Sequence, residues 1–381
     1  LGKCYINQSL LELAQQNFEK ALERNPYHIE VLTALAHIYE FNDSYENAIK
    51  MHELLFLVNE ENEIETLTAL ARLYLKSRDS ENAKKTISQL REHALEHPDV
   101  QTQIGLLYLL QQYREEAILE FSSILKDHPE HSQARFYTAI LFEENDHLDE
   151  AYQNYSLINS SEKRFFAEAR TRMALILYKK NKNTEAIRCL DEAIKKFPTA
   201  YILHETKGNL LFISGNTSEA IKYLQLESKN SEYAPLYLES VAHIYEKIGE
   251  LHKAKDTLEQ ALEKFPKDEN LMFSLGALQQ KYGNDQESLH IMQEILNLNP
   301  DNAQALNFVG YILAEQGERL DEAEKLVQKA LLLKPRDSYI IDSLGWVYFK
   351  QGNYHKALAH LHKAAEQSPE EAVIWEHLGD V

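Results

Sequence analysis

Glycine and alanine recur in this chain at a fixed spacing, and that spacing constrains the fold more than any other feature. In one series, seven glycines and five alanines follow one another at intervals of 34 or 35 residues. The members are Gly2, Ala36, Ala71, Gly105, Ala139, Ala174, Gly208, Ala242, Gly276, Gly310, Gly345 and Gly379. A period of this length predicts a stack of repeated units rather than two or three globular domains.

Two further series divide each unit into parts. The other five glycines each follow the first series by seven residues: Gly215, Gly249, Gly283, Gly317 and Gly352. Seven prolines follow it by 24 or 25 residues: Pro26, Pro129, Pro198, Pro266, Pro300, Pro335 and Pro369. A glycine inside a helix costs about 1 kcal/mol relative to alanine, so its recurrence indicates close helix packing. The second glycine fits a left-handed residue at a helix end, and the proline ends a second helix. Each unit is therefore predicted to be helix A, a tight turn, helix B and a second turn.

The unit that begins near residue 338 carries the most complete pattern. Its marker residues are Leu344, Gly345, Tyr348, Gly352, Tyr354, Ala357, Leu361, Ala364 and Pro369. This pattern resembles the tetratricopeptide repeat, and the resemblance covers the whole chain. It implies an all-α fold: a right-handed superhelical solenoid of stacked antiparallel helix pairs, with about eleven units and truncated at both ends. Over a single solenoid 1–381, units are expected to begin near residues 1 (partial), 29, 64, 98, 132, 167, 201, 235, 269, 303, 338 and 372 (partial).

Two turns depart from the pattern. The turns 159–166 and 228–234 lack the usual proline, and Glu227 stands where a small or apolar residue is expected. We expect flexible joints at 159–166 and 228–235.

The composition excludes several classes of function. A net charge of −20 argues against a nucleic-acid partner, which requires a basic stripe. The two cysteines, Cys4 and Cys189, have no metal-ligand spacing, and no apolar stretch is long enough to span a membrane. The glycines all belong to the repeat, so there is no phosphate-binding loop, and no GxSxG or HExxH motif occurs. His93 and His97 stand four residues apart, but pairs of this kind are expected by chance among sixteen histidines. We expect no enzyme activity, metal or cofactor.

The resemblance implies that helix A lines a concave face and that its exposed positions bind partners. In the middle of the chain these positions become apolar, and a second aromatic cluster follows near the C-terminus. The candidate partner-binding residues are Leu106, Leu109, Leu110, Phe136, Ile140, Leu175, Tyr178, Phe212, Tyr311, Trp346 and Phe349. Packing between helices is the alternative role for each of them, but a contiguous apolar band favours a binding surface. The hypothesis is that the groove of units 98–234 receives an apolar or amphipathic segment and that Trp346 anchors a second contact.

Three functions remain open. The first is a scaffold that binds a peptide or helical segment of partner proteins. The others are a recruitment arm of a larger enzyme or transport machine, and a self-assembling array. Segment 303–381 resembles repeats of bacterial proteins, many of them exported or lipid-anchored, which gives a weak preference for envelope assembly or secretion in the periplasm or at the outer membrane over a cytoplasmic location.

Overall fold

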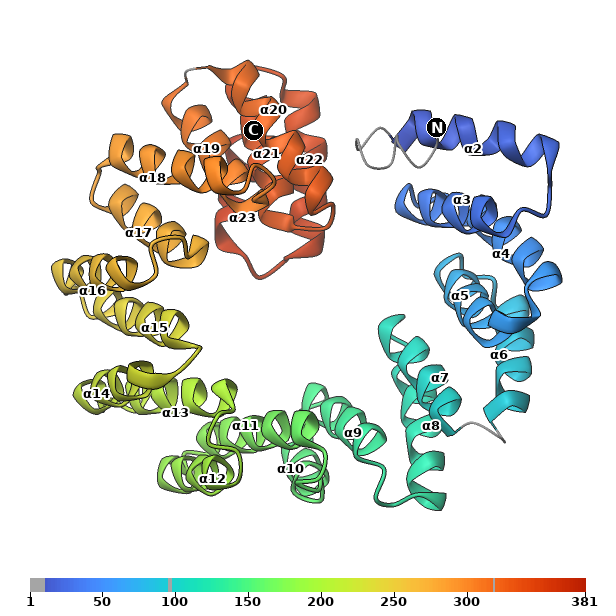
Figure 1. Ribbon diagram of the computed structural model, residues 1–381, viewed down its shortest axis with the longest axis horizontal. Coiled ribbons are helices and arrows are strands. Elements are labelled where there is room, and N and C mark those ends of the chain that lie inside the picture. Colours follow the sequence, from blue (N-terminus) through green and yellow to red (C-terminus); the bar gives the residue numbers. More distant parts are fainter. Residues whose placement is uncertain (1–10, 95–97, 318) are drawn as a thin grey trace. The chain divides into compact units, whose positions relative to one another are not determined.

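A computed structural model describes residues 11–94, 98–317 and 319–381, and over these residues it contains helices and no strands. The chain divides into two compact units, 1–203 and 204–381, with the boundary inside helix α13. Each unit is described here by itself. Within both, helices alternate as the first and second members of antiparallel pairs, called A and B helices below (Figure 1).

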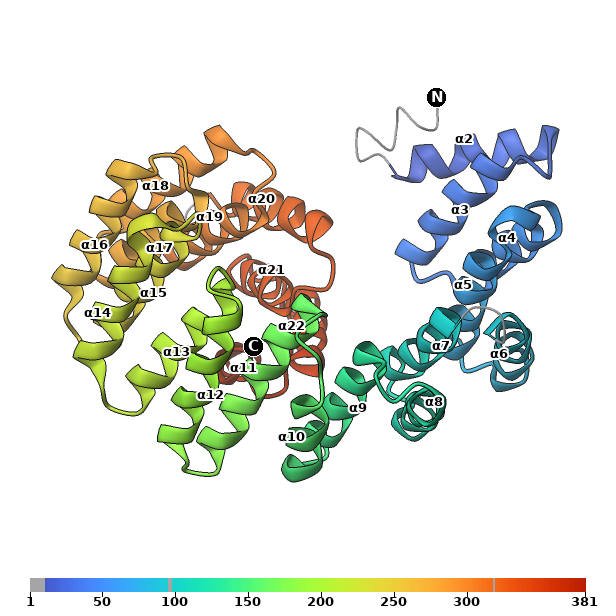
Figure 2. The same ribbon diagram turned by 60° about the horizontal axis from the view of Figure 1, so that its bottom comes forward.

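The described part of unit 1 starts with helix α2 and continues with five pairs, whose successive stacking is visible in Figure 2. The A helices are α3 (Ile29–Phe41), α5 (Glu63–Lys76), α7 (Pro98–Leu110), α9 (Ser132–Glu144) and α11 (Lys163–Lys179). The B helices are α2 (Leu11–Arg24), α4 (Tyr45–Val58), α6 (Ser80–Ala94), α8 (Arg114–Asp127), α10 (Leu148–Ser156) and α12 (Asn183–Lys196). A short 3-10 helix, η1 (Glu60–Asn62), precedes α5.

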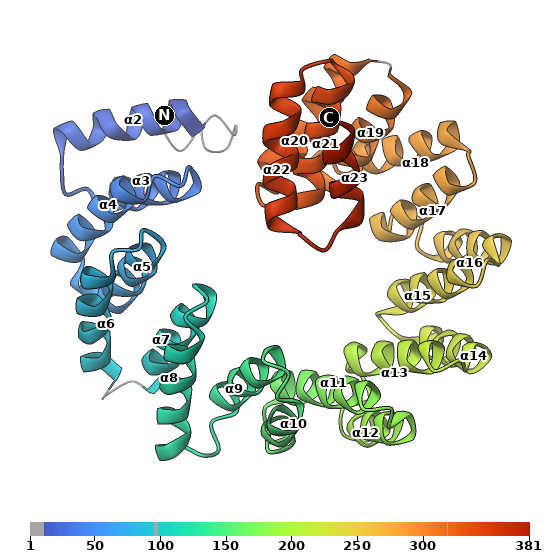
Figure 3. The ribbon, with the colours of Figure 1, turned by 180° about the vertical axis from the view of Figure 1, so that it is seen from behind.

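Unit 2 continues the same alternation (Figure 3). Its A helices are α13 (Tyr201–Ile213), α15 (Ala234–Lys247), α17 (Glu269–Lys281), α19 (Ala303–Gln316), α21 (Ser338–Lys350) and α23 (Ala372–Asp380). Its B helices are α14 (Thr217–Glu227), α16 (Leu251–Lys264), α18 (Asp285–Leu298), α20 (Leu320–Leu333) and α22 (Tyr354–Gln367). The 3-10 helix η2 (Ser228–Asn230) follows α14.

Five glycines of the first series lie where the A and B helices of one pair approach each other closely: Gly105, Gly208, Gly276, Gly310 and Gly345. A methyl group added to Gly105 would come within 2.5 Å of the Phe121 ring, and one added to Gly345 within 2.7 Å of Leu361. The alanines of the same series, such as Ala139, are fully buried. The predicted packing role of these small residues is therefore confirmed.

The tight turn between the A and B helices contains a left-handed residue in every complete pair that the structure describes. All five predicted glycines have positive φ, from +69° at Gly317 to +86° at Gly215. In unit 1 the equivalent position holds a residue with a side chain, and φ still lies between 52° and 63°: Asp43, Arg78, Gln112, Asp146 and Asn181. The glycine prediction is confirmed, and the same turn persists where the glycine is missing.

Proline ends the B helices as predicted. Helices α2, α8, α12, α16, α18, α20 and α22 each end two residues before a proline of the series. The residue before a proline is pushed out of the helical region by a clash with the proline ring, which explains this fixed distance.

Helix α11 begins at Lys163, four residues before the predicted unit start near 167, so the turn that precedes it is shorter than 159–166. Helix α10, which precedes this turn, is short and has only nine residues. The Arg170 guanidinium of α11 donates to the carbonyl oxygens of Tyr155 (2.8 Å) and Ser156 (3.2 Å) at the end of α10. These bonds satisfy carbonyls that have no partner within a helix and end α10 early.

Glu227, the other departure, ends α14. Its carboxylate lies 3.3 Å from Nδ1 of the buried His204, so it has a polar partner within unit 2. None of the described helices is both long enough and apolar enough to cross a membrane.

Candidate functional site

In both units, several A helices touch the A helix of the neighbouring pair directly. In unit 1, α5 packs on α7 and α9 on α11; in unit 2, α15 packs on α17, α19 on α21 and α21 on α23. This close approach makes the A-helix side the inner, concave side of the stack within each unit. The surface formed by A helices is called the A-helix face below.

In unit 1, the first candidate residues lie on α7. Leu106 and Leu109 are half-buried and pack against the core of this unit, whereas Leu110 is 70% exposed at the end of the helix. Helix α7 therefore places three leucines on or beside the A-helix face, two of them half-buried and one exposed.

The next candidates come from α9 and α11. Ile140, Leu175 and Tyr178 are half-buried, so each keeps part of its side chain accessible. Together with Leu106, Leu109 and Leu110 they form what we call the apolar band of unit 1.

Phe136 is 3% exposed, so the expectation that it lies open in the groove is wrong. Its ring packs against Phe165 of α11 and Tyr155 of α10, with centroids 5.4 and 5.6 Å away. One of these rings comes from its own pair and the other from the following pair, so Phe136 serves as core between the pairs.

Trp346 of unit 2 is also buried, at 7% exposure, so it is not an open anchor. His377 from α23 stacks on the indole at 4.2 Å, and Phe349 packs against it at 4.9 Å. The indole N–H donates to Glu315. The next A helix covers Trp346, while Phe212, Tyr311 and Phe349 remain half-buried.

A pocket of about 420 Å³ opens on the A-helix face of unit 2, beside this cluster. Four successive A helices contribute to it, and we call it the aromatic–acidic pocket. Its lining residues are Phe273 from α17; Gln304, Asn307, Phe308 and Tyr311 from α19; Asp337, Tyr339, Ile340, Asp342 and Ser343 at and within α21; and Val373 and His377 from α23.

Polar and aromatic groups are combined in this pocket. Nδ1 of His377 lies 2.9 Å from Oδ2 of the buried Asp342. Burial and the nearby carboxylates of Glu315, Asp342 and Glu376 raise the pKa of Tyr311 to about 12, so its hydroxyl stays protonated near neutral pH. The rings of Phe273 and Phe308 meet edge to face at 5.7 Å.

Of this pocket, the sequence had singled out only Tyr311 as a candidate. Phe273 and Phe308 occupy neighbouring rather than equivalent positions of adjacent A helices, three residues before Gly276 and two before Gly310, so the repeat pattern carried no signal for the pair. His377 carried no signal either, because its importance depends on the residue on which it stacks.

A second cavity, polar and about 300 Å³ in volume, lies in unit 1 and surrounds Glu40 between α3, α4 and α5. The Glu40 carboxylate lies 3.0 Å from Nε2 of His52 and accepts a bond from Arg72 at 2.7 Å. Burial alone would raise the pKa of Glu40, but the bonds from His52 and Arg72 outweigh it and lower the pKa to about 2. Glu40 thus pairs both with His52 of its own repeat and with Arg72 of the next repeat.

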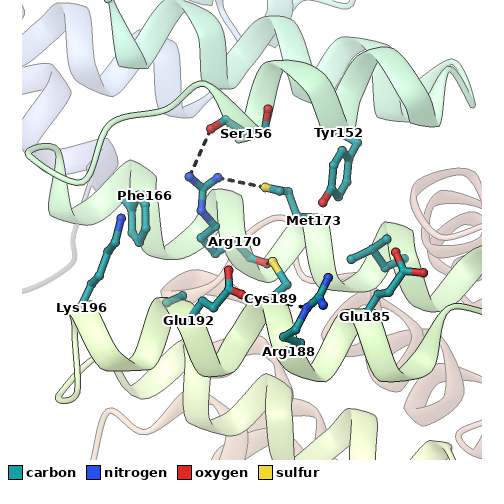
Figure 4. A pocket seen from close by; sticks show the side chains of 12 residues that line it. Tyr152, Ser156, Phe166, Arg170, Met173, Glu185, Arg188, Cys189, Glu192 and Lys196 are labelled. Carbon is teal, nitrogen blue, oxygen red and sulfur yellow. Dashed lines mark hydrogen bonds and ion pairs between the residues drawn. The ribbon is translucent and has the colours of Figure 1, made fainter.

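A third cavity, of about 260 Å³, is lined by residues of the B helices α10 and α12 and of the A helix α11 (Figure 4). Arg170 lies at its centre and Cys189 at its wall. Burial raises the pKa of the Cys189 thiol to about 11, which keeps it protonated and unreactive near neutral pH. The cavity lies beside the end of the short helix α10, where Arg170 donates hydrogen bonds to the last carbonyl groups of that helix.

The histidine pair of the sequence falls partly outside the described residues, because His97 belongs to 95–97. His93 lies 3.5 Å from Glu63. Within the described ranges, no group of three or more His, Cys, Asp or Glu side chains is arranged to hold a metal ion.

Family models described as tetratricopeptide repeat match residues 1–28, 171–235 and 223–381. The TPR repeat-containing protein PA4667 of Pseudomonas aeruginosa is 32% identical over 174 residues, which are 45% of this chain and 29% of that protein. The human interferon-induced protein with tetratricopeptide repeats 2 is 30% identical over 137 residues, 33% of this chain and 28% of that protein. The matched segments thus span less than a third of either relative.

Among solved structures, the crystal structure of yeast Tom70 is similar to this chain with a TM-score of 0.57. The alignment covers 100% of this chain and 86% of that one at 17% sequence identity. At this identity the likeness supports the fold alone.

Proposed function

This chain belongs to the tetratricopeptide-repeat family, and we propose from this premise that it is a protein-interaction scaffold. Its A-helix face would hold a peptide or helical segment of a partner protein. The observation that carries the proposal is the aromatic–acidic pocket, because four successive A helices leave a cavity there rather than filling it with their own side chains. Concave sites with apolar walls and a few convergent polar groups are the usual form of binding sites.

The apolar band of unit 1 is proposed as a second contact surface for the same kind of partner. Half-buried leucines such as Leu109 and Leu175 can pack against the apolar stripe of an amphipathic helix, with anchors spaced along one of its faces. Phe212 and Phe349 extend the proposed surface of unit 2. Buried Phe136 and Trp346 would support the surface from below.

The finer part of the proposal is a place in bacterial envelope assembly or secretion. It is supported by the resemblance of segment 303–381 to repeats of bacterial proteins and by the Pseudomonas relative. We propose binding rather than catalysis as the activity, because the pocket and the band both offer contact surface.

The test is affinity capture with the full chain and three folded double variants, followed by a direct binding measurement on each captured partner. Leu109→Ser with Leu175→Ser alters the apolar band, and Phe308→Ala with Tyr311→Ala enlarges the pocket. The matched control, Leu119→Ser with Leu226→Ser, changes exposed leucines on B helices. Circular dichroism establishes that each variant is folded.

We expect at least one partner to lose affinity about tenfold or more with a band or pocket variant and to bind the control normally, as anchor residues typically cost more than 1 kcal/mol on truncation. A partner list that is the same for all four proteins would rule out the A-helix face as the binding surface.

A further inference from the structure

We propose that the aromatic–acidic pocket receives an arginine side chain from the bound partner segment. This inference rests on the proposed scaffold function and specifies the chemistry of its ligand. It follows from three features of the pocket: the sign of its charge, its aromatic walls and the number of its hydrogen-bond acceptors.

The ionisable acidic groups that line the pocket are Asp337 and Asp342, His377 lies beside Asp342, and none of the lining residues is a lysine or arginine. Asp337 caps α21 through one oxygen, which accepts from the amides of Tyr339 and Ile340. Asp342 contacts only His377 among the bonds the structure gives it. A carboxylate has about four acceptor sites, so both groups retain capacity for a donor from a ligand. An anionic ligand would be repelled here.

Aromatic side chains form much of the wall. Phe273 and Phe308 enter from adjacent A helices, and Tyr339 is 53% exposed at the N-terminal end of α21. The face of an aromatic ring attracts a cation through its negative charge distribution, and a planar guanidinium can also stack on it. The wall therefore favours a cation over a neutral polar group.

The acceptors favour arginine over lysine. The Asn307 side-chain oxygen is buried and has no hydrogen-bond partner, although Asn307 lines the pocket. With Asp342 and the Tyr311 hydroxyl it provides acceptors on two adjacent helices. A guanidinium presents five donors in a rigid fork and can reach acceptors in different directions, whereas an ammonium is a compact point charge. Ile340 and Val373 supply apolar surface for the methylene stem of the arginine.

The test uses a phage-displayed random peptide library selected on the immobilised full chain. Enriched peptides are synthesised with a fluorescent label, and each is paired with a copy in which arginine is replaced by citrulline, its uncharged isostere. Fluorescence anisotropy then measures the affinity of each peptide for the wild type, Asp342→Asn, Phe308→Ala and Glu294→Gln. Glu294 is an exposed carboxylate on the B helix α18 and serves as the matched control.

We expect the enriched peptides to share an arginine beside an apolar residue. Citrulline and Asp342→Asn should each weaken binding at least about tenfold, while Glu294→Gln changes it less than about twofold. Combining citrulline with Asp342→Asn should weaken binding by much less than the product of the two single effects, because both remove the same interaction.

Other outcomes separate the two proposals. Peptides without a basic residue that lose binding in Phe308→Ala would overturn the arginine inference and leave the scaffold function standing. An arginine peptide whose affinity is unaffected by Asp342→Asn would place its binding elsewhere and overturn the assignment of the pocket. A selection that enriches no peptide would count against both.

Discussion

Each B helix carries a small residue at one equivalent position of the repeat, and this residue is alanine in ten of the eleven repeats, from Ala14 to Ala357, and serine at Ser288. It is fully buried, and its hydroxyl has no hydrogen-bond partner. A buried polar group without a partner loses its bonds to water and gains nothing in return. The serine is therefore a local weakness in the packing of α17 against α18.

We predict that Ser288→Ala raises the free energy of unfolding by about 1 kcal/mol, because it removes the unsatisfied hydroxyl and adds helix propensity. Urea denaturation followed by circular dichroism measures the change. The control is Ser274→Ala, which removes a hydroxyl that donates to Glu239 at 2.6 Å and should lower the stability. Equal effects of the two substitutions would contradict the explanation.

Glu40 predicts a dependence of stability on pH. Its pKa in the folded chain, about 2, lies below the ordinary value of 4.5, so its contribution is fully present above about pH 4.5 and is lost as the pH falls towards 2. The difference corresponds to at most about 3 kcal/mol.

We therefore expect the wild type to lose more stability than Glu40→Gln between about pH 5 and about pH 2.5, a range that covers most of this loss, as measured by urea denaturation at each pH. Glu23→Gln, at an exposed position of α2, should leave the wild-type dependence unchanged. Parallel curves for Glu40→Gln and the wild type would show that the network with His52 and Arg72 contributes little.

At the scale of the element, the turn between A and B helices keeps one backbone conformation while its residue type changes. Unit 2 fills the left-handed position with glycine, and unit 1 fills it with Asp43, Arg78, Gln112, Asp146 and Asn181. A residue with a Cβ atom is strained by about 1–2 kcal/mol in this region. The helices on either side hold the conformation in place.

We predict that Gln112→Gly stabilises unit 1 by about 0.5–1 kcal/mol, since the relief of strain exceeds the entropy that a glycine adds to the unfolded chain. The reverse substitution Gly352→Ala should destabilise unit 2 by about 1 kcal/mol, although no atom lies within 4 Å of the added methyl group. Thermal unfolding checks both. A lower melting temperature for Gln112→Gly would show that its side chain contributes more than the strain costs.

The same turn shows what a sequence can and cannot reveal about an element. The five glycines predicted the left-handed residue because glycine is the residue that adopts this region without strain. No single residue type is common to the five turns of unit 1, so only their register with the glycine turns identifies them. The length of α10 was also out of reach, because Arg170 reaches its end from a different helix.

For the whole molecule, the fold was predictable because it repeats. Helix packing, turns and helix ends each recur every 34 or 35 residues, so every unit reinforces the prediction made from the others. Within each unit the described contacts join helices that are close in sequence, so the prediction of the fold did not depend on contacts between distant segments.

The candidate site was less predictable, because exposure depends on the neighbouring repeat. Position alone suggested that Phe136 and Trp346 face a groove, but rings from the following pair cover both. The aromatic–acidic pocket results from the opposite case, in which side chains of four A helices leave a space. A repeat pattern gives the direction of a side chain and says nothing of whether its neighbour fills the space in front of it.

The contacts between A helices have a consequence for how such a chain evolves. Asp342 meets His377, Thr68 meets Gln103 and Glu239 meets Ser274, and in each pair the two residues are 35 positions apart. In each pair the first residue stands three positions before the small residue of its repeat, and its partner stands two positions before the small residue of the next repeat. These two neighbouring positions are therefore not independent: a substitution at one of them changes the selection on the other in the next repeat. A consensus sequence averaged over the repeats would remove these residue pairs, which distinguish one array from another.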